Sequence, residues 1–387
     1  MESRKVSVVK CTEYRPELLE QKIRESLENI GFDTVRFSGA RVALKPNLLL
    51  PSEVEKAIIT HPEFFRAVAR IVKQSGGMPF LIESPCIHSL PRTLDKTPYR
   101  RMLEEEGVEA ADNEPTRTVR NENAVRFKNI DVSAAFFDAD IIVSLPKFKT
   151  HGLTYMTGAV KNLLGTIPGL QKSKMHVKLP SADEFSDFLL DLYGAMRGGF
   201  DKPKELLHIM DAIVGQEGEG PGTAGTPKAL NAIFAAWDAV GLDYVATKAS
   251  GLDPDRAPTI VKGMARGLGP ARPQEIEVVG DDVKSLGNQP FEASRGTFMS
   301  NMIRWPMNTK WFKNLMIDRP WPREEICTLC YQCRKICPAG AISKATDGKK
   351  TPAYDYDICI RCYCCMEACP EAAITRKAGK LQWLSRL

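Results

Sequence analysis

The sequence predicts an α/β domain, a mostly parallel sheet flanked by helices, followed by a small C-terminal α+β domain. Apolar runs alternate with amphipathic stretches over the first 290 residues. Most of these runs lack the polar alternation of strands that have one exposed face, so both faces should be buried. The cysteines, in contrast, are crowded near the C-terminus, and 387 residues suffice for two or three domains.

Six strands are predicted in the first domain. They cover residues 6–11, 41–44, 78–82, 140–145, 206–210 and 232–236. Two of the helices between them begin with capping-box spacing, Thr60 with Glu63 and Ser181 with Glu184. We interpret His61 as part of the first of these helix starts. This alternation predicts a parallel sheet but leaves the order of the strands open.

Nine of the 11 cysteines lie between Cys327 and Cys369, and eight of these form an internal repeat with an offset of 32 residues. The first copy is Cys327, Cys330, Cys333 and Cys337 before Pro338, and the second is Cys359, Cys362, Cys365 and Cys369 before Pro370. This C-x2-C-x2-C-x3-C-P spacing is that of bacterial two-cluster ferredoxins. It predicts two [4Fe–4S] clusters, and therefore transfer of single electrons, in a ferredoxin-like domain.

The spacing also predicts which cysteines share a cluster. Three thiolates in one tight loop can reach one cubane, whereas the cysteine before proline starts a new chain direction and reaches the other. The first cluster should therefore bind Cys327, Cys330, Cys333 and Cys369, and the second Cys337, Cys359, Cys362 and Cys365. Zinc sites and disulfides fit this pattern poorly. Cys364 is left over, as a small, partly buried residue or, alternatively, a redox-active or replacement ligand.

The predicted boundaries are 1–295 for the α/β domain, 296–322 for an aromatic and basic linker, and 323–387 for the ferredoxin-like domain. The linker contains Trp305, Trp311 and Trp321 and is expected to pack against one or both domains. A membrane-surface or docking helix is the alternative, and single-stranded nucleic acid binding is a weaker one.

Composition limits the remaining classes of function. A net charge of +5 is too mild to indicate nucleic acid binding by itself. The sequence has no run of eighteen apolar residues, so it predicts no transmembrane helix. Its first residues lack the pattern of a secretory signal. We expect a cytoplasmic protein.

Polar residues follow four of the predicted strands, where ligands gather in open parallel sheets. They are Lys45 and Asn47, then Glu83 and Ser84, then the turn from Pro146 to His151, and finally Asp211. Because these carboxyl ends lie along one edge, they predict one convergent binding site.

The segment 145–178 has six lysines and no acidic residue. Its lysines are Lys147, Lys149, Lys161, Lys172, Lys174 and Lys178. Such a field attracts an anion, either a carboxylate or a phosphate. We predict binding roles for Lys149, Thr150, Lys161 and Asn162, and we place Lys172 further out. A solvated loop, or a surface for an acidic partner, is the alternative.

Within this segment, His151 is the candidate general acid or base, and Lys147 the second candidate catalytic residue. No G-x-G-x-x-G or Walker A motif is present, so dinucleotides and ATP have no support in the sequence. A flavin is compatible with the sequence but has no motif.

The chain resembles the uncharacterised iron–sulfur proteins known as the domain of unknown function 362 family, over roughly residues 5–290. The residues that carry the resemblance are Lys45-Pro46-Asn47-Leu48-Leu49, Thr60-His61-Pro62, Glu83-Ser84-Pro85, Leu145-Pro146-Lys147, Lys149-Thr150-His151, Lys161-Asn162-Leu163-Leu164-Gly165 and Asp211. Many members have Asp-Ser-Pro-Gly where this chain has Glu83-Ser84-Pro85-Cys86. The resemblance implies iron–sulfur chemistry in anaerobic metabolism, and a remote similarity to lactate racemases.

The leading hypothesis is an iron–sulfur oxidoreductase that exchanges electrons with an anionic small molecule in the α/β domain and with a redox partner protein. One alternative is an electron carrier or maturation factor that docks an acidic partner. Another is an isomerase or racemase-type domain with an accessory ferredoxin. A deep pocket beside one cluster would favour an enzyme, and a flat basic face a carrier.

Overall fold

The structure is a computed structural model that describes residues 4–85, 88–169, 171–179, 181–287, 289–294, 314, 318–346 and 348–379. Most of the linker predicted at 296–322, with Trp305 and Trp311, lies outside the described residues. Among the described residues, no helix combines the length and apolar content needed to cross a bilayer.

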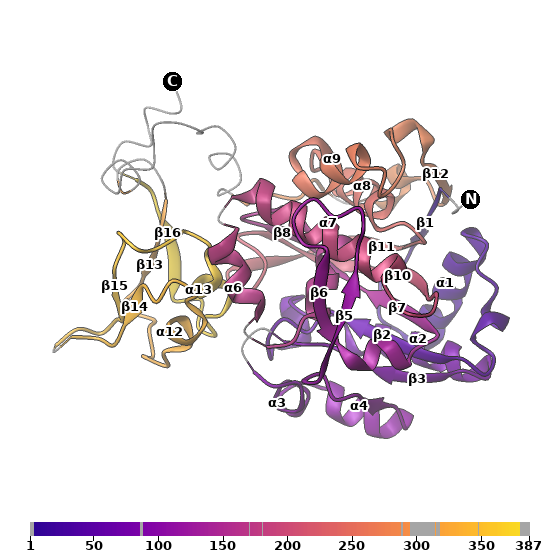
Figure 1. Cartoon of the computed structure of the whole chain (residues 1–387), viewed down its shortest axis with the longest axis horizontal. Helices are drawn as coiled ribbons and strands as arrows, with labels where there is room; N and C mark the ends of the chain where they lie inside the picture. The colour runs from indigo at the N-terminus through magenta and orange to yellow at the C-terminus, as the bar shows by residue number, and fades with distance from the viewer. Residues whose placement is uncertain are drawn as a thin grey trace.

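A ten-stranded sheet forms the centre of the first domain (Figure 1). Along its main path the strands are β12 (Glu277–Gly280), β1 (Lys5–Lys10), β11 (Gly225–Ala236), β10 (Glu205–Gly218), β7 (Ile141–Leu145), β2 (Arg41–Pro46), β3 (Met78–Leu81) and β4 (Glu109–Ala110). β8 (Lys147–His151) pairs with β10 in parallel and with β9 (Tyr155–Thr157) in antiparallel fashion. On the main path only β11 runs against its neighbours, which confirms the mostly parallel sheet.

Helices cover both faces of this sheet. On one face lie α1 (Pro16–Asn29), α2 (Pro62–Gln74), α3 (Leu90–Asp95) and α4 (Tyr99–Glu106), and on the other lie α5 (Ala159–Asn162), α7 (Ala182–Gly198), α8 (Ala239–Ala249) and α9 (Pro258–Ala265). Successive strand residues point to opposite faces. Val42 and Leu44 pack in the first hydrophobic core, under α1–α4, and Ala43 packs in the second, under α5 and α7–α9. The continuous apolar runs follow from this double burial.

The two predicted helix starts differ in their outcome. Ser181 caps α7 as predicted, since its hydroxyl accepts from the N–H of Glu184 at 3.1 Å and donates to the carboxylate of Glu184 at 2.9 Å. At α2 the predicted role of Thr60 is wrong, because His61 is the cap and its Nδ1 accepts from the N–H of Glu63 at 3.2 Å. Thr60 instead donates to the Leu145 carbonyl at 2.7 Å.

The expectation of a turn from Pro146 to His151 is also wrong. Residues 147–151 form β8, and all five are buried. Residues 149–151 pair with β9, and on the other side Lys147 lies opposite Asp211 and Lys149 opposite Gln216 of the long strand β10. A hairpin of β5 (Thr116–Arg120) and β6 (Asn129–Ser133) adds Val119, Ile130 and Val132 to the second core.

The C-terminal domain is small and consists of short elements. They are β13 (Arg319–Pro322) paired with β16 (Ile374–Lys377), β14 (Ile342–Ser343) paired with β15 (Ala353–Tyr354), and the helices α12 (Gln332–Ile336) and α13 (Cys364–Glu367). The repeat is visible in the backbone, because Tyr331 and Tyr363 precede the two helices with φ of 56° and 60°.

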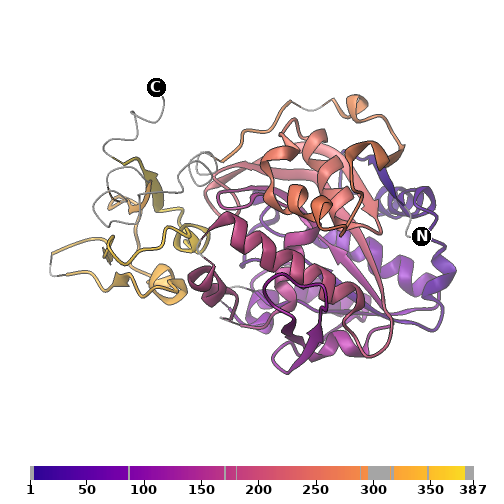
Figure 2. The same ribbon diagram turned by 45° about the horizontal axis from the view of Figure 1, so that its top comes forward.

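This domain lies beside α6 (Gln171–Lys178) at one end of the α/β domain (Figures 1 and 2). The connection between β10 and β11 holds it there. Thr223 donates a hydrogen bond of 2.5 Å to the carbonyl of Cys369, and Glu219 forms an ion pair with Arg376. The α13 segment therefore faces the carboxyl ends of the central strands.

Gly222 is required for this close approach. Its φ is +112°, and a Cβ there would lie 2.8 Å from the carbonyl oxygen of Glu367 and 2.9 Å from its Cα. We predict that Gly222→Ala loosens the domain contact, which hydrogen exchange would detect as faster exchange in α13.

Gly267→Ala is the matched control, because Gly267 also has a positive φ, +65°, but no atom lies within 4 Å of a Cβ there. Both variants should lose about 1–2 kcal/mol of folding free energy through backbone strain. Only Gly222→Ala should change exchange in α13. Equal exchange in the two variants would show that Gly222 does not maintain the contact.

Candidate functional site

Lys45, at the end of β2, is fully buried and anchors the first cluster of polar residues at the sheet edge. Its Nζ donates to Glu83 Oε2 at 2.6 Å and to Asn162 Oδ1 at 3.3 Å. Burial lowers the pKa of Lys45, and the negative charge of Glu83 opposes that shift. Gly165 makes room for the pair, since a Cβ there would lie 1.9 Å from Glu83 Oε1 and 2.7 Å from Lys45 Nζ.

Lys147 belongs to a second cluster, which is closed. Its Nζ donates to Asp211 Oδ2 at 2.7 Å and to the Tyr14 hydroxyl at 2.8 Å, while that hydroxyl donates to Asp211 Oδ1 at 2.8 Å. The Tyr14 ring stacks on His61 with centroids 3.7 Å apart. Burial lowers the pKa of His61 to about 4, so its imidazole is neutral. These partners satisfy one another, as a structural network does.

Lys149, also fully buried, has a different environment. Its Nζ donates to Asn47 Oδ1 at 2.5 Å and to the carbonyl of Ile58. Within the described ranges no carboxylate forms an ion pair with it. Burial, together with the charges of Lys161 and Lys147, holds the pKa of Lys149 well below its usual range.

A pocket opens next to these clusters, with room of about 70 Å³. Five residues predicted from the sequence line it, namely Asn47, Glu83, Ser84, Lys161 and Asn162. The remaining lining residues are Leu49, Thr157, Leu164, Gly165, Lys172, Cys364 and Glu367. The last two belong to α13, so the wall of the pocket is shared by both domains.

Lys172 was expected further out, and that expectation is wrong. It is 6% exposed, and its Nζ donates to the carbonyl of Ser84. This contact brings α6 against the turn after β3. Glu367, which had no signal in the sequence, reaches the pocket from the other domain. Burial raises the pKa of Glu367, opposed by the charges of Lys161, Lys149 and Arg376.

Asp243 on α8 positions the helix that carries Lys161 and Asn162. Its carboxylate accepts from the N–H groups of Ala159 at 2.6 Å and Val160 at 3.1 Å, at the start of α5. Gly158 permits this contact, because a Cβ there would lie 2.1 Å from Asp243 Oδ1. Burial raises the pKa of Asp243 to about 7, although the two hydrogen bonds lower it.

Thr150 and His151 lie at the domain contact and do not line the pocket. The Thr150 hydroxyl donates to the carbonyl of Gly218 at 2.9 Å. His151 Nδ1 accepts from the N–H of Leu153 at 2.9 Å, and its Nε2 lies 3.5 Å from Glu367 Oε1. The catalytic roles of His151 and Lys147 remain predictions.

The cysteines gather where the repeat predicts a cluster. One hollow is lined by Cys327, Cys330, Cys333 and Cys369, and four thiolates around one cavity suit a [4Fe–4S] cluster. Burial raises the pKa of the Cys337 thiol, and the charges of Cys362 and Cys359 also raise it. Charges act in this way only when they are close, so Cys337 lies near the second copy of the repeat. The four cysteines of this hollow therefore fit a [4Fe–4S] cluster. That each cluster takes its fourth cysteine from the other copy of the repeat remains a prediction.

Cys364 is 4% exposed and packs with Ile336 and Ala368 between the two short helices. It lies beside Cys365, and its side chain contributes to the wall of the pocket. It is therefore more completely buried than the small, partly buried residue that the sequence led us to expect.

Each of the two domains matches a known protein family. Residues 42–248, more than half of the chain, match the family described as domain of unknown function DUF362. Residues 319–378 match the 4Fe-4S dicluster domain. A thylakoid-associated protein of Synechocystis sp. is 32% identical over 267 residues, which are 68% of this chain and 80% of that protein.

Two solved structures resemble the chain more distantly. A Thermotoga maritima protein has 11% identity and a TM-score of 0.41, with 63% of this chain and 61% of that chain covered. The lactate racemase apoprotein from Thermoanaerobacterium thermosaccharolyticum has 12% identity and a TM-score of 0.40, with 64% and 57% covered. This chain thus spans less than two thirds of either structure.

The raised pKa of Asp243 predicts a pH dependence of stability. Folded Asp243 keeps its proton up to about pH 7, whereas unfolded it loses the proton near pH 4. Its contribution to the free energy of unfolding is therefore present below about pH 4 and is lost as the pH rises through about 7. Asp243→Asn has no proton to lose, so its stability relative to the unchanged protein should rise between about pH 4 and 7 and level off above that. Urea unfolding over that range measures it, and parallel curves would contradict the prediction.

The prediction that each cluster takes its fourth cysteine from the other copy of the repeat can be tested by the iron content of two variants. Cys337→Ser should damage the cluster predicted to bind Cys359, Cys362 and Cys365, so that iron falls from about eight per chain toward four. Cys364→Ser is the control and should retain about eight, because its thiol is not a predicted ligand. Iron analysis of anaerobically purified protein decides the matter. Full iron in Cys337→Ser, or half lost in Cys364→Ser, would overturn the assignment.

Proposed function

Because the chain belongs to the DUF362 family and carries a 4Fe-4S dicluster domain, we propose that it is an iron–sulfur oxidoreductase whose substrate is a small anion. The substrate would bind in the pocket between the domains. One observation carries the proposal: this pocket is lined by strand-end residues of the α/β domain and by Cys364 and Glu367 of the cluster-binding domain. When bound, the clusters supply one-electron transfer.

The lining of the pocket suits an anion. Lys161 and Lys172 line it, and Lys45 and Lys149 lie directly behind Glu83 and Asn47. Because Lys45 is paired with Glu83 and the pKa of Lys149 lies well below its usual range, the positive charge comes mainly from Lys161 and Lys172, opposed by Glu367. The Asn47 and Asn162 amides and the Ser84 hydroxyl add neutral hydrogen-bonding groups. A positive site of this kind attracts carboxylates and phosphates.

The size of the pocket limits the substrate further. A volume of about 70 Å³ holds a few water-sized groups, which suits an ion of several heavy atoms and not a nucleotide. Its lining lysine Lys172 is only 6% exposed, and partial removal from water strengthens the attraction between such a lysine and an anion. The chain's own residues thus bind and orient the anion against α13, in which Cys365 is a predicted cluster ligand.

The burial of the lysines argues against the carrier hypothesis. A docking surface for an acidic partner would need Lys147, Lys149 and Lys172 at the surface, and all three are buried. An isomerase with an accessory ferredoxin would not need α13 in its pocket wall. We also propose a cytoplasmic location, because free thiols and exposed clusters persist best in a reducing compartment.

We predict that Lys172→Gln weakens anion binding about tenfold or more, since a partly desolvated charged hydrogen bond is lost. Inorganic phosphate and acetate are suitable probes in isothermal titration calorimetry. Lys178→Gln is the matched control on the same helix, because Lys178 is exposed. Its effect should stay below about twofold and fade above an ionic strength of about 0.15 M.

Electron paramagnetic resonance of the reduced protein adds a second test. A probe that binds against α13 should change the spectrum, and Lys172→Gln should abolish that change. Equal, wholly salt-sensitive losses in both variants would indicate a docking surface, and an unchanged spectrum with a bound probe would separate the pocket from the electron-transfer path.

A further inference from the structure

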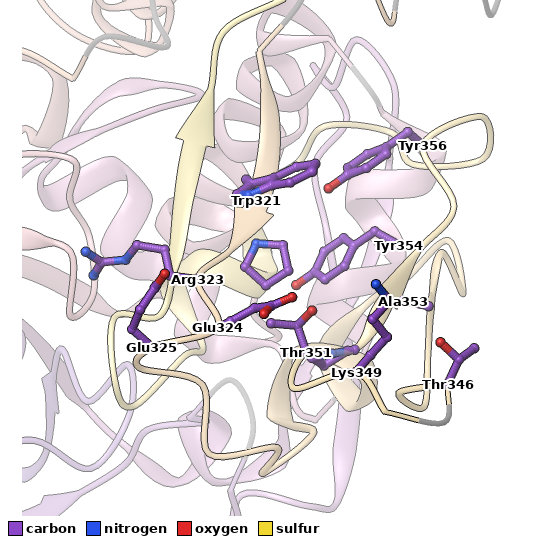
Figure 3. A pocket seen from close by; sticks show the side chains of 12 residues that line it. Trp321, Arg323, Glu324, Glu325, Thr346, Lys349, Thr351, Ala353, Tyr354 and Tyr356 are labelled. Atoms are coloured by element: carbon purple, nitrogen blue, oxygen red, sulfur yellow. The ribbon is translucent and has the colours of Figure 1, made fainter.

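A second hollow lies in the cluster-binding domain, away from the anion pocket (Figure 3). Its volume of about 650 Å³ falls in the range of pockets that hold cofactors and drug-sized ligands. It is bordered by β13 and the turn after it on one side, and by Thr346 and residues 349–356 on the other. The proposed function makes no use of this space.

Aromatic rings form one side of the hollow. Trp321 and Tyr356 are nearly parallel, with an interplanar angle of 8° and centroids 6.3 Å apart, and Tyr354 follows at 5.9 Å from Tyr356. Figure 3 shows Trp321 and Tyr356 along one side, with Thr351 and Lys349 opposite. The Tyr356 hydroxyl donates to the carbonyl of Pro320 at 2.8 Å, which fixes the ring. A fixed set of rings stacks flat ligands well.

Trp321 is the most informative of these residues. It is 38% exposed, although tryptophan is on average highly buried in folded proteins. Lys377 Nζ lies 3.7 Å from the centre of its ring, and Arg319 approaches both Trp321 and Tyr356. These cations hold the rings in place and cover part of them, while 38% of Trp321 stays exposed for a ligand.

The remaining lining is polar and of mixed charge. Arg323 and Lys349 contribute cations, Glu324 and Glu325 carboxylates, and Thr351 a hydroxyl. A purely apolar ligand would leave these groups without partners. An aromatic wall opposite polar groups suits a flat ring system that bears polar substituents.

The hollow adjoins the space predicted to hold the first cluster. Pro322, Pro352 and Tyr354 line both the aromatic hollow and the cavity formed by Cys327, Cys330, Cys333 and Cys369. The two spaces are therefore separated by single side chains, of which Tyr354 is one. A ligand in this position would lie within a short distance of a redox centre.

We propose that this hollow binds a planar redox carrier of the flavin or quinone class, stacked on Trp321 and Tyr356. Flavins and quinones share a flat, conjugated ring system with polar substituents. The aromatic side chains of the hollow suit the flat rings, and its polar side chains suit the substituents. Flavin nucleotides also carry phosphate groups, for which Lys349 and Arg323 are suitably charged. This site is distinct in place, size and chemistry from the anion pocket.

The experiment uses the anaerobically purified full chain and titrates it with flavin mononucleotide and with a naphthoquinone sulfonate. Trp321→Ala should weaken binding of the ring system about tenfold, while Trp321→Phe should stay within about threefold because a stacking face remains. Lys349→Gln should weaken binding of the flavin more than that of the quinone if the phosphate lies there. Iron content and circular dichroism establish that each variant is folded.

Ala353→Trp provides a second, independent variant, because it fills the hollow from the opposite side without changing the aromatic wall. It should block both probes, whereas Lys172→Gln in the anion pocket should leave their binding unchanged. Affinity for one probe alone identifies the class of ligand. Absence of binding by either probe, or binding that persists in both Trp321→Ala and Ala353→Trp, would overturn the proposal, whatever the anion pocket does.

Discussion

Burial of lysine side chains at the carboxyl edge of the sheet is the constraint on which the rest of the site depends. An ammonium group removed from water is costly unless the fold supplies hydrogen bonds and opposite charge. Lys45 obtains both from Glu83, and Lys147 obtains them from Asp211, whereas Lys149 has an amide and a carbonyl. These requirements draw the turns after β2 and β3 toward β8 and β10. The pocket is the space that remains where these turns meet.

Local patterns in the sequence predicted the parts that depend on local physics. Continuous apolar runs indicated the buried strands, and cysteine spacing indicated the clusters, because both signals lie within a few residues. β8 was missed because alternating Lys147, Lys149 and His151 are typical of a polar turn, and only distant partners make their burial tolerable. Lys172 was misplaced for the same reason, since its partner is a carbonyl 88 residues away. Glu367 gave no signal, because docking of one domain on another has no local pattern.

The two hollows have opposite chemical characters on one small domain. The inner one is narrow and polar and is shared with the α/β domain, whereas the outer one is wide and aromatic and belongs to the cluster-binding domain alone. Pockets of different volume and lining select ligands of different size and charge. Each adjoins a different part of the cysteine repeat, since Cys364 lines the inner hollow and Tyr354 separates the outer one from Cys333.

The two copies of the cysteine repeat differ in their surroundings. At equivalent positions, 32 residues apart, the first copy has Gln332 and Lys335 where the second has Cys364 and Glu367. Lys335 is exposed, whereas Glu367 lies against the edge of the sheet. An internally duplicated domain would otherwise present two interchangeable halves to its surroundings. Here the duplication is asymmetric, so the small domain has one end that lies against the α/β domain and another that is exposed.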